Sequence, residues 1–280
     1  MKHFFTTETA DFQGLQFITV KSNALKKRAD ITVFDPLSHA GLDGAKRAHK
    51  NDILSALPLV ILLHGVYGSH WAWAMKGKVP ETLQKLVDEG KVQPMILAMP
   101  SDGLFGDGCA YVPHQTENYA RWIVEDVVEV VKEQVPKVTD ASPIFIAGLS
   151  MGGFGALRLG AKYPSVFSGF SGLSSITHFD QMSQFVEDFD NLKDKALEKD
   201  GVFDWLLKNK DHLPPFRFDC GKSDILIEYN RQLHRDLVSH QIPHVYEEFD
   251  GAHSWDYWGE HIGKTLVFFD SLAKGQNHSQ

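Results

Sequence analysis

The chain has 280 residues, of which 43% are hydrophobic and 23% are charged, and its formal net charge at pH 7 is -8. This composition is ordinary for a globular protein and excludes a disordered or fibrous chain. The negative charge disfavours a nucleic-acid partner, because duplex binding needs a basic face that neutralises phosphates. A chain of this length can bury a sizeable core, so we expect one domain over residues 1–280.

Short apolar runs alternate with helical patterns along the chain. The runs have the length of buried strands, and the segments between them carry apolar residues at helical spacing. Strands are expected at 15–20, 30–34, 59–63, 95–99, 143–147, 166–170, 216–220 and 245–249, the first two as an antiparallel edge pair. Helices are expected at 80–89, 118–134, 152–162, 225–239 and 257–272. This alternation predicts an α/β fold with a mostly parallel, doubly wound sheet and helices on both faces.

The region 174–215 departs from this rhythm. It has several short helical patterns but no convincing strand, and it lies between two predicted core strands. An excursion at this position would pass over the carboxyl ends of the strands, where open α/β sheets bind their ligands. We therefore expect a partial cap rather than a second domain.

Residues 148–152 read Gly-Leu-Ser-Met-Gly, a G-x-S-x-G pattern with Ser150 at its centre. A single match of this pattern is weak, but here it follows the apolar run 144–147 and opens a predicted helix, which is the context of a nucleophile elbow. The turn in an elbow is sharp, and Gly148 and Gly152 lack the Cβ atoms that would clash in it. The context favours a nucleophilic serine over an incidental serine in a glycine-rich turn.

A serine hydroxyl is a weak nucleophile near neutral pH and needs a general base with a group that orients it. In a fold with this elbow, an acid and a histidine follow the serine, each on a loop after a later strand. Asp224 follows the seventh predicted strand and His253 follows the eighth. We therefore predict a triad of Ser150, Asp224 and His253. Asp219 and Glu228 are competing acids, but Asp219 falls within the strand and Glu228 falls inside the next helix.

Two backbone amides are expected to bind the oxyanion. Met151 follows the serine at the start of a helix, whose positive dipole end faces the site. The second donor should come from the loop after 59–63, and Val66 is the candidate there. His64 is expected to be a structural hydrogen-bonding residue, because it stands at the end of that strand.

These segments resemble a family of esterases that includes S-formylglutathione hydrolase (esterase D), feruloyl esterases, tributyrin-type carboxylesterases and the antigen 85 mycolyltransferases. The matching segments are HGVYGSHWAW at 64–73, GLSMGG at 148–153, GKSD at 221–224 and GAHSWDYW at 251–258. The resemblance implies an α/β-hydrolase fold with Ser150 as nucleophile, Asp224 as acid and His253 as base. It also implies Val66 and Met151 as the oxyanion donors.

The resemblance leaves the substrate open, because its members act on thioesters, on feruloyl, acetyl-sugar or short-chain esters, or transfer acyl groups to sugars. Its thioesterase members carry a cysteine in the loop that here spans 66–69, where none is present. This difference disfavours an S-formylglutathione hydrolase. Tyr67, Trp71 and Trp255 are candidate substrate-binding residues, although aromatic side chains pack in cores as often. The glycine-rich segment 101–111 is expected to form part of the pocket rim.

Other classes of function are disfavoured by what the sequence lacks or contains. There is no H-E-x-x-H pattern or comparable ligand pair, which disfavours a metal-dependent hydrolase. A binding module without catalysis is disfavoured because each triad residue stands at its expected position. An acyltransferase would share the triad. We expect a serine carboxylesterase that hydrolyses short-chain or aryl esters through an acyl-serine intermediate, without a metal or cofactor.

Several features indicate the environment of the chain. Cys109 and Cys220 are expected to be free thiols rather than a disulfide. The N-terminus lacks the apolar stretch of a secretory signal, and no apolar run has the length of a membrane span. We therefore expect a cytoplasmic protein whose partner is a small-molecule ester, with no nucleic-acid or membrane partner. Association into a homo-oligomer stays open.

Overall fold

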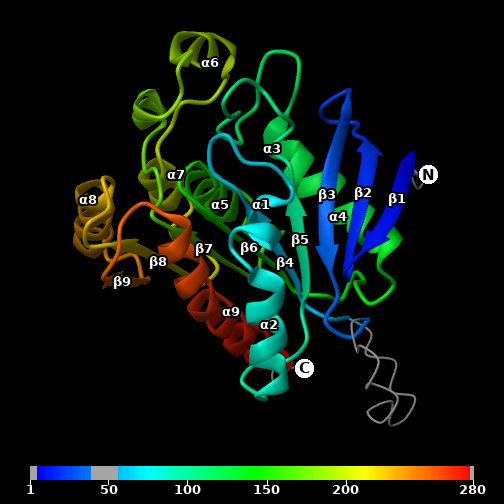
Figure 1. Cartoon of the computed structure of the whole chain (residues 1–280). Helices are drawn as coiled ribbons and strands as arrows, with labels where there is room; N and C mark the ends of the chain where they lie inside the picture. Colours follow the sequence, from blue (N-terminus) through cyan, green and yellow to red (C-terminus); the bar gives the residue numbers. More distant parts are fainter. Residues whose placement is uncertain (1–4, 39–55, 278–280) are drawn as a thin grey trace.

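The computed structural model describes residues 5–38 and 56–277. Its centre is a nine-stranded sheet with the order β1-β2-β3-β5-β4-β6-β7-β8-β9 (Figure 1). The strands are β1 (Thr7–Phe12), β2 (Leu15–Lys21), β3 (Arg28–Phe34), β4 (Leu59–Leu63), β5 (Ile96–Pro100), β6 (Ile144–Leu149), β7 (Gly169–Leu173), β8 (Phe216–Gly221) and β9 (Val245–Phe249). Strands β1, β2, β3 and β5 pair in antiparallel fashion, and all pairs from β5 to β9 along the sheet are parallel.

Helices cover both faces of this sheet. They are α1 (Ala72–Met75), α2 (Val79–Asp88), α3 (Tyr119–Arg121), the π-helical η2 (Trp122–Val127), α4 (Val128–Gln134), α5 (Met151–Lys162), the 3-10 helix η3 (Phe179–Gln184), α6 (Phe189–Lys195), α7 (Val202–Lys208), α8 (Ile227–Ser239) and α9 (Trp255–Asn277). Helices α2 and α9 lie on one face, and α5 lies on the other with α3, η2 and α4 (Figure 1). The predicted doubly wound architecture is therefore confirmed.

The central strands are buried on both faces, which explains their unbroken apolar sequences. In β4, Leu59, Ile61 and Leu63 belong to one hydrophobic cluster, whereas Val60 and Leu62 belong to the other. Successive side chains of a strand point to opposite faces, so a strand between two helical layers needs apolar residues at every position. This arrangement brings the carboxyl ends of the parallel strands to one edge of the sheet.

Two expectations about the strands were wrong in detail. Strand β1 was not predicted, and it pairs with β2, so the pair of β2 and β3 does not form the edge of the sheet. Strand β7 begins at Gly169, three residues later than expected. The cause is a turn in which the Val166 amide donates to the Tyr163 carbonyl at 2.9 Å, before the chain extends.

The region 174–215 contains η3, α6 and α7 and no named strand, as expected. An ion-pair cluster joins it to α5, because Glu198 lies within salt-bridge distance of both Arg158 and Lys162. Helix α6 stands away from the sheet at the top of Figure 1. The region therefore lies on the side of the sheet where the parallel strands end.

Two findings concern the environment of the chain. Cys109 and Cys220 are both free and buried. Within residues 5–38 and 56–277, no helix combines the length and the apolar character that crossing a bilayer requires. The cytoplasmic location stays a prediction.

Candidate active site

Ser150 lies in the sharp turn between β6 and α5. Its backbone has φ 54° and ψ -118°, a conformation that residues with a side chain adopt rarely and at an energetic cost. A Cβ atom at Gly148 would collide with the backbone of Gly152, and one at Gly152 would collide with the carbonyl oxygens of Leu63 and His64. The turn therefore requires both glycines that flank the serine, as the sequence pattern predicts.

The Ser150 hydroxyl is hydrogen bonded to the imidazole of His253, with 3.0 Å between Oγ and Nε2. On the other side of the ring, Nδ1 lies 3.0 Å from each carboxylate oxygen of Asp224. A carboxylate accepts hydrogen bonds, so Nδ1 carries the ring proton and Nε2 is free to accept the serine proton. The structure thus brings the three predicted triad residues together in an order that can activate the hydroxyl.

The loops that carry Asp224 and His253 are joined by their backbones. Two hydrogen bonds connect them, from the Lys222 amide to the Phe249 carbonyl (2.8 Å) and from the Ser223 amide to the Gly251 carbonyl (2.9 Å). The Asp224 carboxylate also accepts the Leu226 amide at 2.8 Å, and its side chain is fully buried. The carboxylate is therefore held in one orientation before it meets the histidine.

The competing acids are engaged elsewhere. Asp219 accepts the Tyr257 hydroxyl at 2.9 Å and lies 2.8 Å from the guanidinium of Arg217. Burial raises the pKa of Asp219 to about 6, although Arg217 and Tyr257 both act to lower it. Glu228 lies on α8 and forms an ion pair within its own helix. Of the three acids, Asp224 is therefore the partner of the histidine.

The two predicted oxyanion donors lie beside the serine. Met151 is the first residue of α5, at the positive end of the helix dipole. The loop after β4 passes so close to Ser150 that a Cβ atom at Gly65 would lie 3.3 Å from the serine Cβ, which brings the following amide, that of Val66, to the site. Among the described residues, neither amide has a hydrogen-bond acceptor. Both can therefore donate to an oxygen that enters the site.

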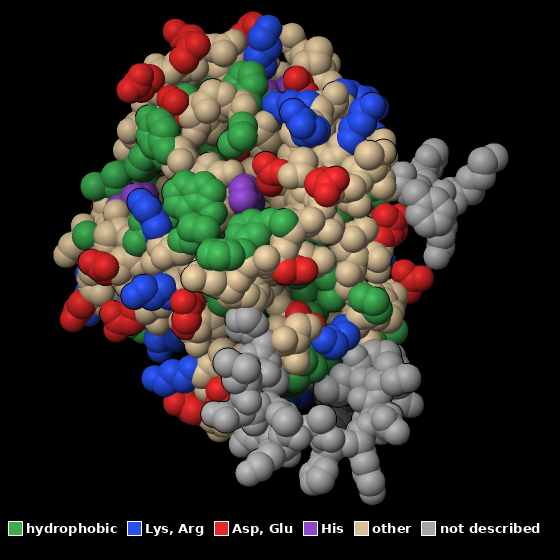
Figure 2. Space-filling view, turned by 45° about the vertical axis from the view of Figure 1, so that its right-hand side comes forward, with side chains coloured by type: hydrophobic (Ala, Val, Ile, Leu, Met, Phe, Trp, Pro, Cys, Tyr) green, Lys and Arg blue, Asp and Glu red, His purple; other side chains and the backbone are tan. Residues whose placement is uncertain are grey.

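A cavity of about 420 Å³ opens beside Ser150 and His253. The three aromatic residues predicted to bind substrate, Tyr67, Trp71 and Trp255, all line it. Trp255 also packs edge to face against Trp73 and Trp258, so it both lines the pocket and contacts the hydrophobic core. Figure 2 shows large hydrophobic side chains beside and below a histidine near the middle of one face of the molecule. The site is thus an apolar hollow with a polar centre, as is usual for small-molecule sites.

Phe185 also lines the cavity, although the sequence did not single it out. It follows η3 in the region 174–215, its ring stacks on His253, and its carbonyl accepts the Tyr67 hydroxyl at 2.8 Å. No signal in the sequence separates it from the other phenylalanines of this region, because periodicity does not give the path of an excursion without regular strands.

The segment 101–111 does not line this cavity, so the expectation that it forms the pocket rim was wrong. It lies behind the loop that follows β4, where the Asp107 carbonyl accepts the Tyr67 amide at 2.9 Å. Gly108 packs so tightly against the Met151 side chain that a Cβ atom would collide with it. The segment therefore supports the site from behind.

The other features of the described residues do not suggest a catalytic site. A larger groove of about 670 Å³ lies between the β1–β3 strands and α2, but its lining contains no serine, cysteine or histidine. No group of three or more His, Cys, Asp or Glu side chains in residues 5–38 and 56–277 could hold a metal ion. The cavity at Ser150 is therefore the candidate active site, although it is smaller than the groove beside α2.

Comparisons with known proteins connect the chain with esterases. The sequence model of a family described as “Putative esterase” matches residues 47–269. The chain is 26% identical over 278 residues to an acetyl esterase from Caldicellulosiruptor saccharolyticus, covering 91% of this chain and 98% of that protein. A solved ferulic acid esterase superposes with a TM-score of 0.75 at 22% identity, covering 96% of this chain and 100% of that chain.

A solved S-formylglutathione hydrolase from Staphylococcus aureus superposes with a TM-score of 0.70 at 18% identity, covering 95% of this chain and 99% of that chain. At these identities, the likeness to both solved structures shows the fold alone. The α/β-hydrolase fold implied by the family resemblance is therefore confirmed.

Proposed function

The chain belongs to the “Putative esterase” family, and from that membership we propose that it is a serine carboxylesterase that hydrolyses short-chain or aryl esters through an acyl-Ser150 intermediate. The observation that carries the proposal is the hydrogen-bonded series of Ser150, His253 and Asp224 at the edge of an apolar cavity. A hydroxyl with a neutral imidazole on one side and an open cavity on the other is placed to attack a bound carbonyl carbon.

The first half of the proposed reaction forms the acyl-enzyme. The Ser150 oxygen attacks the ester carbonyl carbon while His253 Nε2 takes the hydroxyl proton, and the new oxyanion accepts hydrogen bonds from the Val66 and Met151 amides. The tetrahedral intermediate then breaks its bond to the alcohol oxygen, which receives the proton from the imidazolium. Asp224 stabilises the imidazolium and keeps its Nδ1 proton in place.

The second half returns the free enzyme. A water molecule gives a proton to Nε2 of His253 and attacks the acyl carbon, and the same two amides bind the second oxyanion. The bond between the acyl carbon and the Ser150 oxygen breaks, and the imidazolium protonates that oxygen. The products are the carboxylic acid and the regenerated hydroxyl, with no net consumption of any protein group.

The cavity suits a small or planar ester. Its volume of about 420 Å³ is at the low end of the range for small-molecule sites, and its aromatic walls favour an aryl group or a short acyl chain. Two of the similar proteins are named as an acetyl esterase and a ferulic acid esterase, which supports esters of this size. Because Phe185 contributes to the wall, we propose that 174–215 acts as the partial cap.

Two other reactions would use the same groups. A thioesterase would form the same acyl-serine, and the fold is shared with an S-formylglutathione hydrolase. The loop 66–69 lacks the cysteine that the resemblance implies for that branch, which favours a carboxylic ester. An acyltransferase would differ only in the second half, where an alcohol would replace water.

Turnover of p-nitrophenyl acetate tests the proposal. The wild type is expected to hydrolyse it with a metal chelator present, and Ser150→Ala is expected to lower kcat by roughly six orders of magnitude, as for other serine nucleophiles. Turnover that the chelator abolishes, or that persists in Ser150→Ala, would overturn the mechanism. A wild type that is inert on acetyl, butyryl, feruloyl and glutathione thioester substrates would indicate a binding module instead.

A further inference from the structure

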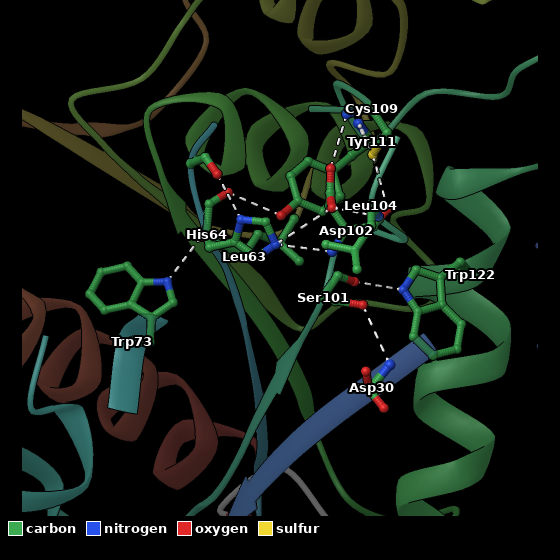
Figure 3. Close-up of polar contacts among 11 residues, drawn as sticks. Asp30, Leu63, His64, Trp73, Ser101, Asp102, Leu104, Cys109, Tyr111 and Trp122 are labelled. Atoms are coloured by element: carbon green, nitrogen blue, oxygen red, sulfur yellow. Dashed lines mark hydrogen bonds and ion pairs between the residues drawn. The ribbon is translucent and has the colours of Figure 1, made fainter. Parts of the chain in front are cut away.

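His64 is held by both of its ring nitrogens, although it does not line the cavity (Figure 3). The side chain is buried at the carboxyl end of β4. Its Nε2 accepts the backbone amide of Asp102 at 3.0 Å, and its Nδ1 lies 2.7 Å from the Gly65 carbonyl oxygen. An amide only donates and a carbonyl only accepts, so a neutral ring with its proton on Nδ1 is the one state that satisfies both partners.

The amide that fixes the ring is itself held in place. The Asp102 carboxylate accepts the Leu104 amide at 2.9 Å and the Cys109 amide at 3.0 Å. The Cys109 thiol donates back to the Asp102 carbonyl at 3.1 Å, and burial raises the pKa of this thiol well above its usual range, so the donor stays protonated. Figure 3 shows this cluster on the far side of His64 from Trp73. The Asp102 amide that donates to the His64 ring is therefore fixed by three hydrogen bonds of its own residue.

The Gly65 carbonyl belongs to the same peptide group as the Val66 amide. The described chain contains no cis peptide bond, and in a trans peptide the C=O and N–H lie in one plane and point in opposite directions. The Gly65 carbonyl accepts two hydrogen bonds, a shorter one from His64 Nδ1 (2.7 Å) and a longer one from the Gly68 amide (3.3 Å). Holding the carbonyl on this side therefore directs the Val66 N–H to the opposite side. Because Gly65 packs against Ser150, a rotation of this peptide would change the direction of the donor at the site.

We propose that His64 is a positioning residue that aims the Val66 amide at the oxyanion by holding the Gly65 carbonyl. The proposal rests on the proposed esterase function, since it assigns a role within the same site. The imidazole does not touch the substrate and exchanges no proton in the reaction. Its effect is to keep the Val66 amide pointed at the oxyanion, and loss of such a donor lowers kcat by roughly 10²–10³-fold in a serine hydrolase.

Two substitutions separate the two ring nitrogens. In His64→Asn, the side-chain N–H lies near the place of Nδ1 and can still donate to Gly65. In His64→Gln, the amide reaches the place of Nε2, so the Gly65 carbonyl loses its shorter hydrogen bond and keeps only the 3.3 Å bond from the Gly68 amide, while the bond to Asp102 can remain. We expect His64→Gln to lower kcat on p-nitrophenyl acetate by roughly 10–100-fold with KM little changed, and His64→Asn to keep most of the wild-type kcat.

A second readout separates aiming from general loosening. A trifluoromethyl ketone forms a hemiketal with the serine, and its oxyanion needs the same donors as the reaction. Its inhibition constant should rise in His64→Gln by about the same factor as kcat falls. Inhibition by p-nitrophenol, which forms no oxyanion, should not change.

Tyr111→Phe is the matched control. The Tyr111 hydroxyl donates to the His64 carbonyl at 3.0 Å, so the variant removes a buried hydrogen bond from the same residue and leaves the Gly65 carbonyl held. It should lower Tm without lowering kcat. A wild-type kcat in His64→Gln would overturn the proposal, and so would an equal loss in Tyr111→Phe.

A folded His64→Asn variant that has lost kcat would also overturn the proposal, so the test stands even if His64→Gln does not fold. A wild type without turnover on esters would contradict the proposed function instead. The failure of the positioning role and the failure of the esterase function are therefore distinguishable.

Discussion

The ring of Phe185 stacks on the ring of His253, with their centroids 5.5 Å apart and their planes inclined by 28°. Phe185 comes from the region 174–215, whereas His253 follows β9, so the excursion touches the triad directly. The hydroxyl of Tyr67 donates to the Phe185 carbonyl and joins this wall to the loop after β4. A change in the excursion can therefore alter both the shape of the pocket and the packing of the imidazole.

Phe185→Ala should widen the pocket and change acyl preference. Removing the ring takes away apolar contact beside the scissile ester, so we expect the ratio of kcat/KM for p-nitrophenyl hexanoate to that for the acetate to rise by roughly tenfold. Phe203→Ala is the control, because that ring lies on α7 against His240 and does not line the cavity. An unchanged ratio in Phe185→Ala, or an equal rise in the control, would contradict the role of the cap.

Asp224→Asn should leave the site intact but favour the wrong tautomer of His253. The asparagine amide can donate to Nδ1, which moves the ring proton to Nε2 and leaves no acceptor for the Ser150 hydroxyl. We expect kcat to fall by roughly four orders of magnitude, as in other triads. Asp219→Asn, at the competing acid, should mainly lower stability. The assignment fails if the two variants exchange these effects in steady-state assays.

Gly152→Ala should destabilise the nucleophile elbow, because its Cβ would meet the backbone carbonyls of Leu63 and His64. We expect a loss of about 1–3 kcal/mol in the free energy of unfolding by urea, together with lower activity. Gly263→Ala in α9 makes a matched comparison. Its Cβ would have ordinary contacts at 3.5 and 3.8 Å, so the methyl group should stabilise the helix by about 0.5–1 kcal/mol. Equal effects at both glycines would refute the steric argument.

His114 should make the fold sensitive to acid. Its ring packs edge to face against Phe105 and Tyr119 and donates from Nε2 to the Cys109 carbonyl, and burial lowers its pKa from 6.5 to about 4. The unfolded chain takes up the proton as pH falls through 6.5, whereas the folded chain resists it until about pH 4. The stability from this neutral ring is therefore complete above pH 6.5 and is lost as pH falls to 4.

His114→Gln keeps a donor near the place of Nε2 but does not titrate. The free energy of unfolding of this variant should fall less steeply than that of the wild type between pH 6.5 and 4, by a total of about 3 kcal/mol at most. Urea unfolding at several pH values measures the difference. Parallel curves for the two proteins would show that His114 does not contribute.

The sequence predicts this fold well where burial leaves a strong pattern. The runs in β4 and β6 are apolar at every position because helices cover both faces, so they could be placed within a residue or two. Strand β1 has no such pattern, since all but its first residue are exposed. In β7, Gly169 and Gly172 carry no side chain that could signal a strand, whereas Val166 favours a strand and moves the predicted start three residues too early.

The candidate site was predictable for a related reason. The elbow, the acid and the histidine each follow a strand whose end is marked by glycine, and parallel strands deliver such loops to one edge of the sheet. Phe185 and the support behind His64 depend instead on contacts between loops. The path of a loop is set by hydrogen bonds such as that from Tyr67 to Phe185, which leave no periodic trace in a sequence.

Within residues 5–38 and 56–277, strand β1 pairs with a strand on one side only, so the backbone donors and acceptors on its other side could pair with a strand of another molecule and begin an aggregate. In an antiparallel pairing of two copies centred on this strand, Glu8 of one copy would face Asp11 of the other. Both carboxylates are exposed, and like charges directly opposite one another repel. The charges of Glu8 and Asp11 therefore oppose pairing between two copies at the edge of the sheet. Replacing both residues with neutral ones would be expected to make the protein prone to polymerise through β1.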